Sequence, residues 1–302
     1  MSISNAAAFL PADTHDKGRL AALGGGLLLS FDPVFIRLSG VGGYDTAFLF
    51  GLFSAVMMAM MVQASDRRGL VGTLRDGGWP LLLSGLLIMC SASTFVLSVK
   101  HTSVANTMVI MSGRPVLTAL ASWVFLREKT PKGLWLTIVG VAVGIFLVMQ
   151  GGLQSGHLWG DGLALITVTC LGLNGTLWRR YKSMSRMAVV GLGGLFIAVV
   201  MSAHADPGSY SPTTWLVMAI MGMGSAPLGR VLNAVSSRYI PASEMATIAL
   251  SSVVLGPTWV FLLLGERPPL STLSGGAVVL GAILLYLLTT RRNGRAMEIK
   301  TE

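Results

Sequence analysis

Long apolar segments, separated by short polar or charged stretches, recur along the whole chain. A helix needs about 20 largely apolar residues to cross a lipid bilayer, and ten segments approach that length. They cover residues 19–38, 44–62, 80–98, 103–126, 133–150, 160–178, 187–203, 213–231, 242–264 and 272–289. Asp32, Arg37 and Arg230 interrupt or border the first and the eighth of them. The pattern predicts an all-α integral membrane protein with ten transmembrane helices.

The composition agrees with a membrane location. Of the 302 residues, 53% are hydrophobic and only 12% are charged, whereas soluble domains are about 25% charged. The net charge of +9 could indicate a nucleic-acid partner in a soluble protein. In a membrane protein it indicates Lys and Arg gathered in cytoplasmic loops, so no nucleic-acid partner is expected. Cys90 and Cys170 lie in apolar segments and are expected to be small core residues.

The basic residues alternate between the two sides that ten helices would create. With the N-terminus in the cytoplasm, 18 of the 22 Lys and Arg residues fall on the cytoplasmic side, as the positive-inside rule requires. We therefore expect both chain ends in the cytoplasm. Residues 1–18 are predicted to be a disordered tail, and residues 291–302 a basic tail.

The chain also resembles itself at an offset of 138 residues, so that Glu128 aligns with Glu266. Each copy is predicted to be a helix, a short charged turn and a second helix. An offset of nearly half the chain indicates a duplicated half, which gives repeats over 19–150 and 160–290. Because five helices per repeat is an odd number, the second repeat is expected to be inverted in the membrane. Inverted repeats are typical of alternating access, with the substrate near the midplane.

Several short motifs resemble the drug/metabolite transporter superfamily in its ten-helix, two-repeat form. They are K-H-T-S-V-A from Lys100, Pro115 thirteen residues before Glu128, L-R-E-K-T from Leu126, and L-G-E-R-P from Leu264. Two positions depart from the family pattern: Arg127 replaces the usual Gly before Glu128, and Pro257 lies nine residues before Glu266 instead of thirteen. These departures leave the substrate branch open.

The resemblance implies a secondary transporter of the bacterial inner membrane. Family members export amino acids, other metabolites or cationic drugs, and the closest in overall look are bacterial exporters of neutral and aromatic amino acids. The resemblance alone implies export instead of import. The alternative is an exporter of multiple drugs or cationic metabolites with the same fold, which would favour an acidic side chain facing the cavity.

Arg114 is the strongest candidate for binding a substrate. It lies eleven residues into its predicted helix, near the midplane, where a charge costs about 2.5–3.5 kcal/mol on insertion scales. It is expected to bind a substrate carboxylate or to pair with Asp32, and both interpretations stay open. Asp32 could instead carry a proton. Pro33 and Pro115 follow the two charged residues directly and predict helix breaks there.

Four further residues are candidates for binding or gating. Asn106 and Glu244 occupy equivalent positions in the two repeats, so each is either a gate residue or a favourable first-turn group. Asn174 is expected to bind substrate or to link helices. Trp178 and Met111 are candidates for the cavity wall, and ordinary packing is the alternative for both.

Small residues four positions apart allow helices in lipid to approach closely. Gly140 and Gly144 in the fifth segment, and Ala277 and Gly281 in the tenth, have this spacing. They are expected to pack the two helices together within one chain, or else to form a dimer face.

Enzyme motifs are absent from the sequence, so we expect no catalytic residues, no cofactor and no metal site. Transport would then be coupled to a proton or to an exchanged substrate, because no nucleotide-binding motif occurs. The expected partners are a small molecule, such as an amino acid, and the lipid bilayer.

Overall fold

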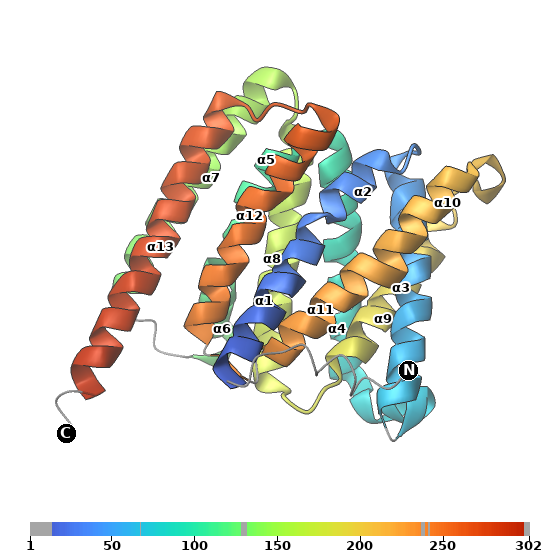
Figure 1. The fold of residues 1–302 in the computed structure, drawn as a ribbon, viewed down its shortest axis with the longest axis horizontal. Coiled ribbons are helices and arrows are strands. Elements are labelled where there is room, and N and C mark those ends of the chain that lie inside the picture. Colours follow the sequence, from blue (N-terminus) through green and yellow to red (C-terminus); the bar gives the residue numbers. More distant parts are fainter. Residues whose placement is uncertain (1–13, 67, 128–131, 237–238, 241, 299–302) are drawn as a thin grey trace.

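The computed structural model describes residues 14–66, 68–127, 132–236, 239–240 and 242–298. These residues form a bundle of helices without a strand among them (Figure 1). The helices are α1 (Thr14–Ser30), α2 (Asp32–Leu38), α3 (Gly43–Ser65), α4 (Gly69–His101), α5 (Val104–Ser112), α6 (Arg114–Leu126), α7 (Lys132–Ser155), α8 (Leu158–Arg180), α9 (Arg186–Met201), η2 (Pro207–Ser209), α10 (Pro212–Ala219), η3 (Ile220–Ser225), α11 (Ala226–Ser236), α12 (Ala242–Leu264) and α13 (Leu270–Glu298).

The lengths and apolar character of these helices confirm an all-α membrane protein. Among the described residues, six helical stretches are long and apolar enough to cross a membrane: His15–Leu38, Gly43–Ser65, Gly69–His101, Val104–Leu126, Trp135–Leu153 and Pro212–Asn233. Three shorter apolar stretches lie in α9, α12 and α13. Large apolar side chains are exposed on the outside of the bundle, as expected where lipid is the solvent.

Several helices extend beyond the predicted segments. Helix α1 begins at Thr14, inside the predicted tail, and residues 1–13 of that tail lie outside the described residues. Helix α4 begins at Gly69 and kinks at Gly78, whose φ of 54° is readily adopted by glycine. The predicted segment began at residue 80, so it covered only the part of α4 after the kink. Helix α13 continues to Glu298 through most of the predicted basic tail. Hydropathy misses such extensions because a helix can carry charges beyond the hydrocarbon layer.

Two helices break at the predicted positions. Phe31 separates α1 from α2, and Gly113 separates α5 from α6. In each case the next helix opens with a charged residue followed by proline, and proline is well tolerated in a first turn because its missing N–H has no helical partner there. The breaks therefore place Asp32 and Arg114 at the first positions of α2 and α6.

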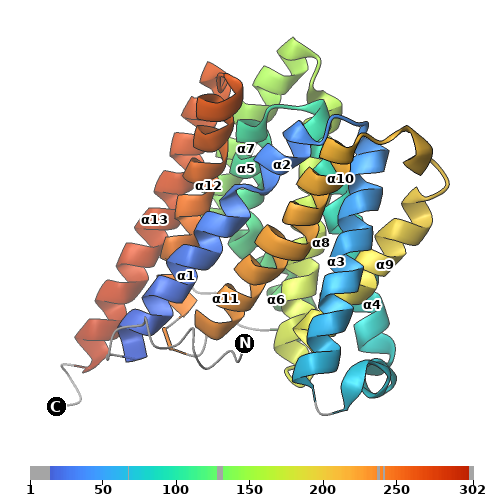
Figure 2. The same cartoon turned by 45° about the vertical axis from the view of Figure 1, so that its right-hand side comes forward.

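Helices meet through small residues at both edges of the bundle. Helices α7 and α13 lie side by side at one edge, and α3 and α9 lie at the other (Figures 1 and 2). A Cβ on Gly144 would lie 2.7 Å from the Gly275 carbonyl, and a Cβ on Gly51 would lie 2.7 Å from the Gly194 carbonyl. Such contacts replace the hydrophobic effect as the source of helix association in lipid.

The small residues of α13 that face α7 differ from those predicted. Gly140 and Gly144 do lie against α13, near Ala282 and Val279. Ala277 and Gly281, however, are exposed, and no atom lies within 4 Å of a Cβ built on Gly281. The spacing of four residues identifies a stripe on a helix, but it does not identify which of several such stripes faces the neighbour.

We expect Gly144→Val to destabilise the protein by about 1–3 kcal/mol, because the added side chain would overpack against Val279 and the Gly275 carbonyl. Thermal unfolding of the detergent-purified protein measures this effect. Gly281→Ala is the matched control and should leave stability unchanged or slightly higher. Equal destabilisation by both variants would contradict the assigned α7–α13 contact.

Candidate functional site

Arg114 opens α6 directly after the break at Gly113. Its side chain is exposed. Among the described residues, no hydrogen bond or ion pair reaches its guanidinium. A charge held inside a membrane protein is expected to face a water-filled cavity when it has no partner. The helix break at Gly113 ends α5, so Arg114 is the first residue of α6.

Asp32 is buried, with 7% of its surface exposed, and its partners are in the second half of the chain. The Ser225 hydroxyl lies 3.3 Å from its carboxylate and 2.7 Å from the Leu28 carbonyl. The positive charge of Arg230 acts on this carboxylate, yet no ion pair within 4.0 Å joins the two among the described residues. The predicted alternative of an Asp32–Arg114 pair is absent from the described ion pairs, because Asp32 faces α11 and the segment before it.

Arg230 is a candidate site residue that the sequence did not single out. It lies in α11, its guanidinium is 5.8 Å from the centre of the Phe50 ring, and its Nη1 atom is buried without a hydrogen-bond partner. The predicted segment ended at residue 231 and so placed Arg230 at a loop. Helix α11 continues to Ser236, which moves Arg230 more than a turn inside. The signal that could have found it is the apolar residues that flank it.

The predicted residues Asn174 and Trp178 belong to one polar cluster between α4 and α8. The Ser84 hydroxyl donates to the Asn174 side-chain oxygen, and the Trp178 indole N–H donates to Ser84 at 2.9 Å. The Arg186 guanidinium lies 5.3 Å from the centre of the Trp178 ring. The cluster therefore also contacts the start of α9.

Met111, the remaining predicted wall residue, lies three residues before Arg114 in the last turn of α5 and is half-buried. Its thioether is flexible enough to fit different apolar groups. Its position beside the helix break is compatible with both the cavity wall and ordinary packing.

Asn106 belongs to a buried network at the end of the bundle where α4 ends and α5, α8 and α13 begin, called here the Glu266 end. Its amide nitrogen donates to both Asp161 carboxylate oxygens, at 3.0 and 3.2 Å, and its oxygen accepts from Thr272. The Thr102 hydroxyl donates to Asp161 at 2.7 Å. Asp161 is completely buried, so this network closes the Glu266 end tightly.

A second layer of contacts closes the same end. Arg37 forms an ion pair with Glu266 at 2.9 Å and donates to the Thr102 carbonyl at 2.9 Å. Glu266 also accepts the backbone N–H of Val104 at 2.8 Å. Together these bonds join α2, the α4–α5 turn and the segment between α12 and α13.

Glu244 forms the equivalent contact at the opposite end, called here the Arg19 end. It is buried, is bonded to Arg19 and lies 3.2 Å from the imidazole of His15. The Arg19 and His15 side chains are 49% and 41% exposed. Water therefore reaches Arg19 and His15, whereas Asp161 is completely buried.

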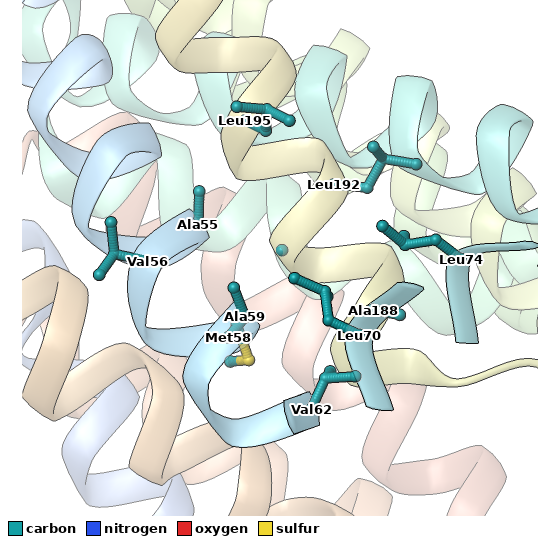
Figure 3. Close-up of a pocket in the computed structure, with 11 residues that line it drawn as sticks. Ala55, Val56, Met58, Ala59, Val62, Leu70, Leu74, Ala188, Leu192 and Leu195 are labelled. Carbon is teal, nitrogen blue, oxygen red and sulfur yellow. The ribbon is translucent and has the colours of Figure 1, made fainter. Parts of the chain in front are cut away.

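A pocket of about 260 Å³ lies between α3, the first turns of α4, and α9, and it contains none of the predicted site residues. Figure 3 shows its aliphatic lining, which includes Met58, Val62, Leu74 and Leu192. Among the residues that line it, none offers a charged or polar side chain. The pocket cannot orient a carboxylate or an ammonium group, so it is not the candidate site.

We expect Ser84→Ala to lower stability by about 1–3 kcal/mol, because Asn174 and Trp178 would both lose a buried hydrogen-bond partner. Chemical or thermal unfolding in detergent measures the change. Ser202→Ala is the control, since that hydroxyl is exposed and bonds only its own helix. A Ser84 variant as stable as the control would show that the cluster contributes little.

Comparisons with known proteins agree with this architecture. The model of the EamA-like transporter family matches residues 16–150 and again residues 158–288. The uncharacterized transporter YyaM of Bacillus subtilis (strain 168) is 24% identical over 244 residues, which cover 73% of this chain and 79% of YyaM. A solved crystal structure aligns with a TM-score of 0.64 over 91% of this chain and 98% of its own, at 16% identity, which shows a shared fold.

Proposed function

Because the chain belongs to the EamA-like transporter family, whose model matches both of its halves, we propose that it is a secondary active transporter. It exports small metabolites that carry a carboxylate, such as neutral or aromatic amino acids, from a bacterial cytoplasm. The substrate binds near the midplane, and the protein works by alternating access. Transport is coupled to a proton or to an exchanged substrate.

Ten transmembrane passes in two inverted halves are supported by the pattern of helix packing. Under an exchange of the halves, α3 corresponds to α9 and α7 corresponds to α13, and the helices of each pair pack on one another. The α4–α8 contact has its counterpart in the α11–α1 contact, and α6–α8 has its counterpart in α12–α1. Contacts that recur in this way are expected of an inverted repeat, in which the halves rock around a central site.

Two gates are supported by the networks around Asn106 and Glu244, which are equivalent positions at opposite ends. The Asn106 network is buried and includes Asp161 and Thr272, whereas the Glu244 network reaches exposed side chains of Arg19 and His15. With the N-terminus in the cytoplasm, the Glu266 end is the outer side. The conformation is then sealed outside and more accessible from the cytoplasm.

The observation that carries the proposed function is the accessible and unpaired guanidinium of Arg114. A carboxylate can accept two parallel hydrogen bonds from a guanidinium, which gives both affinity and orientation. A cation at membrane depth without a partner is costly, so an anionic substrate would relieve the cost while it is bound. A cationic drug would instead meet the positive charges of Arg114 and Arg230, which argues against the multidrug alternative.

We expect saturable counterflow of amino acids in proteoliposomes that contain the purified protein. Arg114→Ala should weaken apparent substrate affinity about 10- to 100-fold, because a hydrogen bond to a charged group is worth about 1.5–3 kcal/mol. Arg75→Ala removes an exposed arginine and serves as the control. Uptake of a labelled amino acid into vesicles loaded with unlabelled amino acid is the measurement.

The results separate the alternatives. Counterflow that survives Arg114→Ala would reject the carboxylate role and retain a carrier. Flux without saturation or counterflow would indicate a channel. A folded wild type that moves drugs but no amino acid would move the proposal to the multidrug alternative.

The proposed topology predicts opposite labelling of two exposed loop positions. In a variant with Cys90 and Cys170 replaced by serine, Ser209→Cys should react with a membrane-impermeant maleimide in intact cells, because it lies between α9 and α10 on the outer side. Lys182→Cys, between α8 and α9, should react only after permeabilisation. Both positions are exposed, so reaction of both from outside would refute the proposed orientation.

A further inference from the structure

The two cysteines of the chain come from different halves. Cys90 lies in α4, inside the first match to the family model, and Cys170 lies in α8, inside the second. Both thiols are free, and both are half-buried. Helices α4 and α8 pack on one another, so the two cysteines belong to a contact between the halves.

Two hydrogen bonds set the register of α4 against α8. The Ser84 hydroxyl donates to the Asn174 side-chain oxygen, and the Thr94 and Thr167 hydroxyl oxygens lie 2.8 Å apart. Residue numbers rise along α4 and fall along α8 between these bonds, so the two helices are antiparallel.

Cys90 and Cys170 lie at one level of this contact, between the two bonds. Cys90 is about one helical turn from Thr94, and Cys170 is slightly less than one turn from Thr167. Both displacements lead toward the Ser84 bond. The two thiol groups are also within reach of one another. A disulfide requires Cα atoms no more than about 7 Å apart, and residues at one level of two packed helices are the candidates for it.

Polar groups lie on both sides of the two thiols. On one side, the Trp178 indole N–H donates to Ser84 at 2.9 Å, and on the other side Thr94 bonds Thr167. A thiol in purely apolar surroundings keeps its proton and stays inert. The two thiols here are partly exposed in a contact that contains hydroxyl groups, so a small polar oxidant reaches them.

We propose that Cys90 and Cys170 form a redox-modification site, at which hydrogen peroxide produces a disulfide between the two halves. One thiol attacks peroxide, breaks its O–O bond and becomes a sulfenic acid with release of water. The second thiol attacks the sulfenic sulfur, the S–S bond forms, and a second water leaves. Two thiols thus lose two electrons to one peroxide molecule. A dithiol reverses the reaction by thiol–disulfide exchange.

The disulfide would join the two helices that also close the Glu266 end. The Thr102 hydroxyl, directly after α4, donates to Asp161 in the first turn of α8 at 2.7 Å. Opening that end requires α4 and α8 to move apart, and a bond between them restricts the movement. Oxidation therefore holds the Glu266 end closed and stops transport. The effect on transport rests on the proposed function.

Cross-linking of the purified protein in lipid nanodiscs tests the site. After treatment with hydrogen peroxide, wild type should lose the mass of two hydrogens and should no longer react with maleimide, and dithiothreitol should restore both thiols. The matched control is Cys170→Ser combined with Thr169→Cys. Thr169 is exposed, and its hydroxyl bonds only its own helix, so this variant keeps two thiols and directs one away from α4. A wild type that forms no disulfide, or a control that forms as much, overturns the site.

Hydrogen exchange of the backbone around Thr102 and Asn106 tests the closure without any substrate. Oxidised wild type should exchange about tenfold or more slowly there than reduced wild type, whereas peroxide should leave the control variant unchanged. A cross-linked protein that exchanges as fast as the reduced one overturns the closure.

Counterflow in proteoliposomes separates this inference from the proposed function. Amino-acid counterflow by wild type should fall about tenfold or more after oxidation and recover with dithiothreitol, because the oxidised Glu266 end stays closed. Undiminished counterflow by the cross-linked protein overturns the switch and leaves the carrier intact. A reduced protein without counterflow overturns the proposed function, and the cross-linking and exchange results then still decide the redox site.

Discussion

Lipid offers no hydrogen bonds, and this constraint governs the structure of the whole chain. Every backbone group in the hydrocarbon layer must find its partner within a helix, so the described part of the chain between α1 and α13 is almost continuous helix. The constraint also affects side chains: many large apolar groups are exposed on the outside of the bundle, whereas Asp32 and Asn174 are buried inside it. Close contacts such as Gly144 with Gly275 then hold together helices that lipid itself does not drive together.

The same constraint explains how two charges come to lie at helix breaks. A break frees carbonyl and N–H groups, which is acceptable in a membrane only where protein or water can satisfy them. Phe31 and Gly113 mark such breaks, and Asp32 and Arg114 open the helices that follow. Backbone groups freed at a break and the charged side chain that follows it are thus kept close together. The remaining helix surface can then be apolar and face lipid.

Much of the fold could be predicted because apolar length and proline position are local properties of the sequence. The all-helical membrane character, the duplicated halves and the breaks before Asp32 and Arg114 belong to this class. The contacts between helices depend on residues far apart in the sequence, and these were not predicted. Arg230 was placed in a loop because the predicted segment stopped at residue 231. Ala277 and Gly281 were expected to pack on the neighbouring helix or to form a dimer face, and it is Gly275 that faces α7. Both cases concern which face or end of a helix meets a neighbour.

The polar contacts at the two ends of the bundle differ in a way that bears on transport. At the Glu266 end, Asp161 is completely buried and Arg37 bridges Glu266 to the α4–α5 turn, so opening that end requires several buried bonds to separate together. At the Arg19 end, Arg19 and His15 on Glu244 are 49% and 41% exposed, and water can replace their bonds at lower cost. A substrate carboxylate bound to Arg114 would neutralise the charge of its guanidinium. The halves could then close around the substrate at the Arg19 end, and the strain of closure would fall on the buried bonds of the Glu266 end. Binding energy at the centre would in this way be converted into opening at the far side, which is the step that alternating access requires.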